Sequence, residues 1–207
     1  SGSKDVTAVE INPIIAETIM RGRFRDLSRG LYFRPGVRVV IEDGRSYVRS
    51  SRERYQLIQA TLVDTWATTA AGAYALSENN IYTTEAFVDY LSHLTDDGLL
   101  SFTRWGFDPP RESLRLLSLA RAALTRMGKP DAARHVIVVR EEGRYRSGRG
   151  MTDTVLISRE PFRVDELERA ALAAAQGEFE IVYMPGQTPD SAFATLLQSP
   201  DPRAFYD

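Results

Sequence analysis

The chain has 207 residues, of which 43% are hydrophobic and 26% charged, and its formal net charge at pH 7 is -2. This size and composition predict one soluble globular domain, and the small charge gives no reason to expect nucleic acid or an anionic membrane as a partner. The absence of cysteine excludes disulfides and thiolate chemistry, and the presence of only 2 histidines argues against a histidine-rich metal site. No apolar run is long enough to span a membrane. We therefore expect a cytoplasmic protein, either by itself or as the soluble domain of a larger membrane-anchored protein.

Strand and helix patterns alternate along the chain. The predicted strands are 6–11, 37–41, 55–63, 99–105, 135–141, 153–158 and 179–184. The predicted helices are 14–24, 45–51, 83–94, 111–127 and 164–175. This alternation predicts an α/β fold with a Rossmann-like, doubly wound and mostly parallel sheet. Because no strong helix separates the strands 135–141 and 153–158, we expect one edge strand to run antiparallel.

One domain accounts for most of the chain. Residues 1–3 (Ser-Gly-Ser) are typical of a cloning scar, residues 4–184 form the Rossmann-like domain, and residues 185–207 are a Pro- and Ser-containing tail that we expect to dock loosely. The Thr- and Ala-rich segment before Thr83 predicts a functional loop. His135 is expected to be structural, and the arginine-rich segment 140–149 is expected to be a solvated hairpin.

Acidic residues follow the first two predicted strands. Glu10 lies at the end of 6–11, and Asp43 is in the Glu42-Asp43-Gly44 segment that closes 37–41, so both are placed at the carboxyl edge of the sheet, where open α/β sheets bind ligands. A carboxylate at Glu10 can accept from two ribose hydroxyls, and Asp43 can accept from an adenine amino group beside Gly44. The alternatives are a solvated strand end for Glu10 and a simple turn for Asp43-Gly44.

Five sequence segments resemble the spermidine synthase family, the polyamine aminopropyltransferases. They are V-E-I-N-P at 9–13, V-R-V-V-I-E-D-G-R-S-Y-V at 37–48, R-Y-Q-L-I at 54–58, Y-T-T-E-A-F at 82–87 and D-D-G-L-L-S-F at 96–102. The resemblance implies the class I S-adenosylmethionine methyltransferase fold, with S-adenosylmethionine or decarboxylated S-adenosylmethionine as cofactor. It implies that Glu10 binds the ribose, that Asp43 and Gly44 meet the adenine, and that Tyr82 and Glu85 border the channel for a small amine substrate.

The sequence also departs from this family. The family's first strand and its glycine-rich loop, which surrounds the sulfonium end, have no counterpart before Lys4, so the domain is expected to be truncated and inactive by itself. The family's catalytic acid aligns with Thr61, which cannot deprotonate an amine. Asp64 is the nearby acid that could replace it, although a turn cap is the alternative. Trp66 is a candidate for stacking in a cationic substrate pocket.

Three functions remain open on the sequence. The first is a spermidine-synthase-like transferase, the second is a non-catalytic domain that serves assembly or regulation, and the third is an S-adenosylmethionine-dependent methyltransferase. A sheet that lacks its first strand would expose an apolar edge, so we also expect a homo-oligomer, most simply a dimer.

Overall fold

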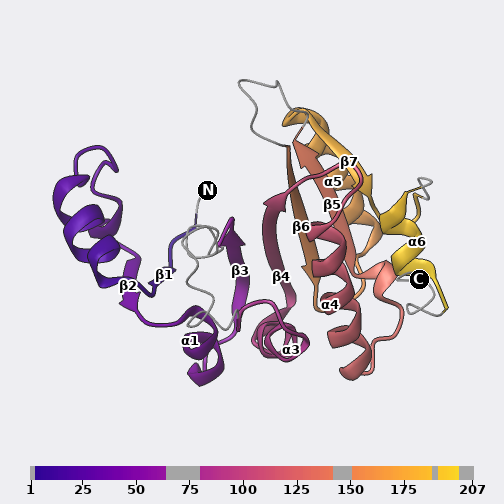
Figure 1. The fold of residues 1–207 in the computed structure, drawn as a ribbon, viewed down its shortest axis with the longest axis horizontal. Coiled ribbons are helices and arrows are strands. Elements are labelled where there is room, and N and C mark those ends of the chain that lie inside the picture. Colours follow the sequence, from indigo (N-terminus) through magenta and orange to yellow (C-terminus); the bar gives the residue numbers. More distant parts are fainter. Residues whose placement is uncertain (1–2, 64–79, 142–150, 188–190, 201–207) are drawn as a thin grey trace. The chain divides into compact units, whose positions relative to one another are not determined.

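The computed structural model describes residues 3–63, 80–141, 151–187 and 191–200. They belong to two compact units, Ser1–Arg52 and Glu53–Asp207, which we call the N-terminal and C-terminal units and describe separately (Figure 1). Both units combine strands with helices, so the predicted α/β class is confirmed.

The N-terminal unit contains two parallel strands. Its elements are strand β1 (Val6–Glu10), π-helix η1 (Ile14–Arg23), 3-10 helix η2 (Leu31–Phe33), strand β2 (Val37–Ile41) and helix α1 (Gly44–Ser50). The strands pair in register from Val6 beside Val37 to Glu10 beside Ile41. The predicted helix 14–24 is present, but it winds as a π-helix, in which the Phe24 N–H donates to the Ile19 carbonyl at 2.8 Å.

The C-terminal unit is a five-stranded sheet with helices packed on it. Its strands are β3 (Tyr55–Thr61), β4 (Leu94–Trp105), β5 (Val136–Glu141), β6 (Thr152–Ser158) and β7 (Phe179–Tyr183), in the order β3-β4-β6-β5-β7. Its helices are α3 (Thr84–Ser92), α4 (Glu112–Arg126), 3-10 helix η3 (Ala132–Arg134), α5 (Val164–Gln176) and α6 (Ala192–Gln198). No helix among the described residues is long and apolar enough to cross a lipid bilayer.

The directions of the strands define the two edges of this sheet. Strands β3 and β4 are parallel, whereas β6 runs antiparallel to both β4 and β5, and β7 runs antiparallel to β5. The expected antiparallel edge strand is therefore β7, and β6 is a second antiparallel strand that lies in the interior. The carboxyl ends of β3, β4 and β5 and the amino ends of β6 and β7 thus meet at the same edge, which we call the carboxyl edge.

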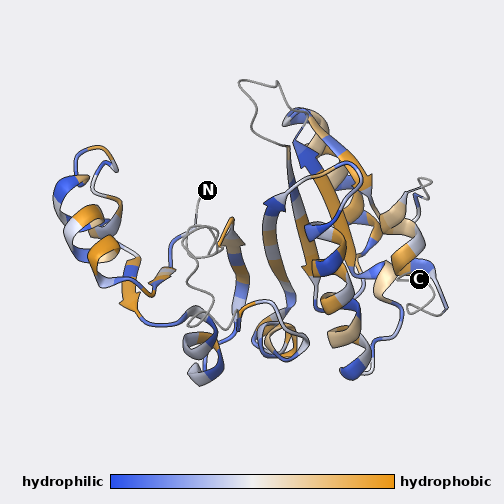
Figure 2. Ribbon diagram, viewed as in Figure 1, coloured by the Kyte–Doolittle hydropathy of each residue, from blue (hydrophilic) through white to orange (hydrophobic). Residues whose placement is uncertain are grey.

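Helices α3, α4 and α6 pack side by side against the sheet (Figure 1). Strands β5 and β6 contribute many of the hydrophobic residues of the sheet (Figure 2), and Val136, Val138, Val155 and Ile157 are fully buried. Phe102 of β4 is almost fully buried and stacks on Phe87 of α3, with ring centroids 5.2 Å apart and planes at 17°. The predicted loose tail contains α6, whose Phe193, Leu196 and Leu197 are buried in the core.

Strand β4 begins earlier than the sequence predicts. Asp96-Asp97-Gly98 indicates a turn, but the segment forms a bulge within the strand, because Tyr55 pairs with Leu94 whereas Leu57 pairs with Leu99. A side chain at position 98 would lie 2.8 Å from the Tyr55 carbonyl oxygen, so the bulge requires glycine there.

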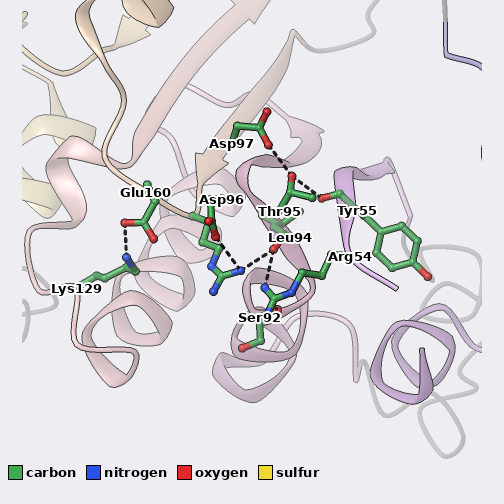
Figure 3. Close-up of polar contacts among 10 residues, drawn as sticks. Arg54, Tyr55, Ser92, Leu94, Thr95, Asp96, Asp97, Lys129 and Glu160 are labelled. Carbon is green, nitrogen blue, oxygen red and sulfur yellow. Dashed lines mark hydrogen bonds and ion pairs between the residues drawn. The ribbon is translucent and has the colours of Figure 1, made fainter. Parts of the chain in front are cut away.

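Two arginines hold this end of the strand. The Leu94 carbonyl accepts from Arg54 Nη1 at 3.1 Å and from Arg159 Nη1 at 2.7 Å (Figure 3). Arg54 also donates to the Ser92 carbonyl at 3.3 Å, at the end of α3. The junction between α3 and β4 is therefore tied to residues just before β3 and just after β6.

His135 is buried, as expected for a structural residue, and its Nδ1 lies 3.2 Å from the Ser158 carbonyl. Burial lowers the pKa of the His135 imidazole, so the folded protein keeps it neutral. Below the ordinary pKa of about 6.5 the unfolded chain binds a proton that the folded chain resists. Stability contributed by neutral His135 should therefore be present above that pH and be lost as the pH falls.

The variant His135→Asn keeps a nitrogen donor but does not titrate. We expect the free energy of unfolding of the wild-type chain to fall more steeply between pH 7 and pH 5 than that of the variant, by up to about 1.4 kcal/mol per pH unit. Urea unfolding followed by circular dichroism measures both profiles. Parallel profiles would contradict this assignment.

Candidate functional site

Glu10 lies at the carboxyl end of β1 and is half-buried. Its Oε1 accepts from the Asn12 backbone N–H at 2.9 Å, and the Asn12 side chain in turn accepts from the Ile14 N–H at 2.9 Å. These two short-range contacts fix the turn between β1 and η1. The carboxylate of Glu10 is therefore held at the strand end, with Oε2 as the oxygen that a ligand would meet.

Asp43 follows the paired strand β2 and is the N-cap of α1. Its Oδ1 accepts from the Ser46 N–H at 2.8 Å, which satisfies one of the amide groups left unbonded at a helix start. The adjacent Gly44 is the first residue of α1, and a β-carbon there would meet no atom within 4 Å. Open space thus lies next to the backbone, as the approach of a flat ring would need.

The predicted site residues fall into three groups. Glu10, Asp43 and Gly44 come together in the N-terminal unit, where the ends of β1 and β2 are linked by a hydrogen bond of 3.2 Å from the Glu42 N–H to the Glu10 carbonyl. Tyr82 and Glu85 belong to the C-terminal unit. Asp64 and Trp66 lie outside the described residues.

Tyr82 is part of a polar cluster at the carboxyl edge of the C-terminal unit. Its hydroxyl donates to the Val63 carbonyl at 2.5 Å and accepts from Arg104 Nη1 at 3.1 Å. The Arg104 guanidinium also lies over the Tyr82 ring, 4.7 Å from its centroid, and pairs with Glu112 at 2.7 Å. This cluster links the ends of β3 and β4 to the start of α4.

Glu85 is the second residue of α3 and forms an ion pair with α4. Its side chain is 59% exposed and its Oε1 is 2.5 Å from Arg126 Nη1 on the neighbouring helix α4. An ion pair this exposed contributes little to stability. This ion pair joins α3 to α4, and the substrate role of Glu85 stays a prediction.

Thr61, which aligns with the family's catalytic acid, is the last residue of β3 and is exposed. It pairs with Thr103 of β4, and its Oγ1 accepts from Gln59 Nε2 at 3.1 Å. The position expected to carry a carboxylate therefore presents a hydroxyl.

A buried ion pair that was not predicted from the sequence lies behind this edge. Asp153, at the start of β6, is fully buried and binds Arg140 of β5 through two contacts of 2.7 and 3.1 Å. Ser113 of α4 donates to the same carboxylate at 2.8 Å. The hydrogen bond and charge of Asp153 raise the pKa of Arg140. Arg140 was expected in a solvated hairpin, and that expectation is wrong because β5 and β6 pair directly and bring Asp153 beside it.

No protein-family model and no curated protein matches this sequence. Among solved structures, the chain is similar to the spermidine synthase of Thermotoga maritima, with a TM-score of 0.51 and 17% identity over 90% of this chain and 58% of that one. It is also similar to a probable spermidine synthase from Corynebacterium glutamicum, with a TM-score of 0.54 and 17% identity over 94% of this chain and 61% of that one.

A structure of spermidine synthase in complex with the transition-state analogue AdoDATO gives a TM-score of 0.50 and 16% identity over 90% of this chain and 57% of that one. The chain spans about three fifths of the length of these enzymes. Identities this low establish the architecture alone, and they confirm at that level the resemblance seen in the sequence. The chain therefore has the Rossmann-like fold of the spermidine synthases.

Proposed function

We propose that this chain is the cofactor-binding part of a transferase and that it binds the adenosyl group of S-adenosylmethionine or of its decarboxylated form. The observation that carries the proposal is the placement of Glu10 and Asp43 at the carboxyl ends of two paired parallel strands. Ligands of open α/β sheets bind at such ends. The complex of a related fold with AdoDATO supports the same ligand class.

Each carboxylate has one oxygen engaged by the backbone and one directed to the ligand in this proposal. Glu10 Oε1 holds the Asn12 N–H, so Oε2 would accept from a ribose hydroxyl. Asp43 Oδ1 holds the Ser46 N–H, so Oδ2 would accept from the adenine amino group. Hydrogen bonds to charged acceptors contribute about 1.5–3 kcal/mol each.

Two conservative variants test these contacts. Glu10→Gln keeps the size of the side chain but removes its charge. Asp43→Asn keeps an oxygen for the helix cap but turns an amide N–H2 toward the adenine amino group, so that two donors face each other. Calorimetric titration of the full chain with methylthioadenosine should show Kd values about 10- to 100-fold higher for each variant.

Glu17→Gln is the matched control, because Glu17 is an exposed acid of the same unit whose partner is Arg21 of its own helix. It should bind methylthioadenosine like the wild type. The proposal is overturned if the wild-type chain binds none of methylthioadenosine, S-adenosylmethionine and decarboxylated S-adenosylmethionine. In that case the non-catalytic assembly or regulatory role becomes the better assignment.

A comparison of the affinities for S-adenosylmethionine and for its decarboxylated form distinguishes methyl transfer from aminopropyl transfer. Thr61 provides no base for an attacking amine, so aminopropyl transfer to putrescine has no support from this residue. Preferential binding of S-adenosylmethionine over the decarboxylated form would favour methyl transfer. Preferential binding of the decarboxylated form would favour aminopropyl transfer.

A further inference from the structure

The segment 23–34 of the N-terminal unit is strongly basic. Its sequence is R-F-R-D-L-S-R-G-L-Y-F-R, with four arginines and one aspartate, so its formal charge is +3 although that of the whole chain is -2. It runs from the last residue of η1 through η2 (Figure 1). We call it the arginine turn. Hydrophobic and hydrophilic residues lie next to each other in this part of the unit (Figure 2).

Backbone hydrogen bonds fold the arginine turn back on itself. Arg29 and Gly30 have φ values of 52° and 63°, and two successive left-handed residues reverse the direction of the chain. The Gly30 N–H donates to the Arg25 carbonyl at 2.8 Å, and the Arg29 N–H donates to the Asp26 carbonyl at 2.9 Å. The reversal brings the Arg25 guanidinium to 4.5 Å from the centroid of the Phe33 ring. The arginine turn therefore has a defined conformation with a cation held against an aromatic ring.

Apolar side chains of the arginine turn are exposed to solvent. Leu27 is 79% exposed and Phe33 is 51% exposed, and Phe24 and Leu31 are exposed as well. Single exposed apolar residues are common on protein surfaces, but a group of them within one short segment marks an interaction surface. Each of these side chains would gain free energy by leaving water.

The positive charge of the arginine turn is not neutralised by acidic side chains. Arg23, Arg29 and Arg34 are exposed, and none of them forms an ion pair with any residue that the structure describes. Arg21, which lies just before the segment, does have such a partner, because it pairs with Glu17 of η1 at 3.2 Å. The arginine turn thus presents free guanidinium groups and apolar side chains together.

We propose that the arginine turn binds the surface of an anionic lipid membrane. Guanidinium groups bind the phosphates and carboxylates of lipid headgroups, and phenylalanine and leucine side chains enter the boundary between headgroups and acyl chains. The contact of Arg25 with Phe33 serves both purposes, because the ring enters the apolar layer while the guanidinium stays at headgroup level. This inference does not depend on the ligand proposed for Glu10 and Asp43.

The leucines favour a lipid surface over nucleic acid. Single-stranded nucleic acid stacks its bases on aromatic rings and guanidinium planes, and its phosphates bind basic side chains. Leu27 and Leu31 have no flat face for a base, so their exposure contributes nothing to such a complex. An acyl layer buries them, and anionic headgroups neutralise the arginines that flank them.

Co-sedimentation of the full chain with lipid vesicles tests the proposal. We expect binding to vesicles of phosphatidylcholine mixed with phosphatidylserine, little binding to phosphatidylcholine alone, and weaker binding as the salt concentration rises. The double variant Arg23→Gln, Arg34→Gln should lower the partition coefficient about 25-fold, since each arginine near an anionic surface contributes about fivefold. Leu27→Ser should lower it about tenfold, because the leucine side chain no longer leaves water.

Matched controls come from the C-terminal unit. The double variant Arg115→Gln, Arg134→Gln removes two exposed arginines and changes the net charge by the same amount. Leu172→Ser replaces a leucine of α5 that is 60% exposed. Both controls should bind the vesicles like the wild type, and far-ultraviolet circular dichroism shows whether every variant keeps the wild-type fold.

Several results would overturn the proposal. They are an absence of binding to the phosphatidylserine vesicles, equal binding to both kinds of vesicle, and a loss in the controls as large as that in the variants of the arginine turn. A single-stranded oligonucleotide is titrated in parallel. If the Arg23→Gln, Arg34→Gln variant weakens oligonucleotide binding while Leu27→Ser leaves vesicle binding unchanged, the arginine turn is a nucleic-acid site and the membrane assignment is wrong.

Discussion

Replacing Asp153 with alanine should lower the free energy of unfolding of the C-terminal unit by about 3–5 kcal/mol. The substitution leaves the Arg140 guanidinium, whose side chain is 13% exposed, without its carboxylate, and it removes the acceptor of the Ser113 hydroxyl. Gly106 packs against the same carboxylate, since a β-carbon there would lie 2.8 Å from Asp153 Oδ1. Urea unfolding followed by circular dichroism measures the loss.

A double variant separates the charge effect from the loss of packing. Asp153→Leu combined with Arg140→Met replaces both charges by apolar side chains of similar volume, which is often neutral or stabilising for a buried pair. It should recover most of the stability lost in Asp153→Ala. If the single variant costs less than about 1 kcal/mol, or the double variant is no more stable than the single one, the pair does not have the role assigned to it here.

Phe102→Ala should destabilise the C-terminal unit by about 3–5 kcal/mol, the range typical of truncating a buried aromatic residue. The Phe102 ring is 1% exposed and lies 5.2 Å from Phe87, 5.7 Å from Tyr82 and 6.1 Å from Tyr90, measured between ring centroids. Alanine leaves a cavity among three aromatic rings that cannot easily collapse.

Phe179→Ala is the control for this truncation. Phe179 begins β7 and is 42% exposed, so the same change of residue type should cost about 1 kcal/mol or less. Chemical unfolding of both variants under the same conditions gives the comparison. Equal losses would mean that the aromatic cluster around Phe102 adds nothing to the stability of the core.

Local patterns accounted for the elements of this fold, because apolar runs such as 37–41 and 136–139 and caps such as Asp43 act over a few residues. The pairing of strands that are far apart in the sequence was harder to predict. Nothing in the segment 153–158 tells that β6 inserts between β4 and β5, and the turn residues Asp96-Asp97-Gly98 gave no sign that a strand continues through them. Helix α6 was not predicted, although the sequence contains an N-cap signal for it. Ser191 caps this helix by accepting from the Ala194 N–H at 3.2 Å.

The residues of the candidate site also divide into those that local sequence patterns predict and those that depend on long-range contacts. Glu10 and Asp43 were found because each lies at the carboxyl end of an apolar strand, Glu10 as the last residue of β1 and Asp43 two residues after β2. Arg104 and Asp153 were missed because their partners, Glu112 and Arg140, are recognised only once α4 and β5 are in place.

The two arginines on the Leu94 carbonyl have a consequence at the opposite end of β4. Because side chains alternate along a strand, sliding β4 by one residue relative to β3 would exchange every residue on one face for those on the other. Arg104 would then stand where Thr103 stands, away from the Tyr82 ring and from Glu112. Arg54, Arg159 and the Gly98 bulge anchor β4 against such a slip. The alignment fixed at the amino end thus keeps the polar cluster of Tyr82, Arg104 and Glu112 assembled at the distant carboxyl end.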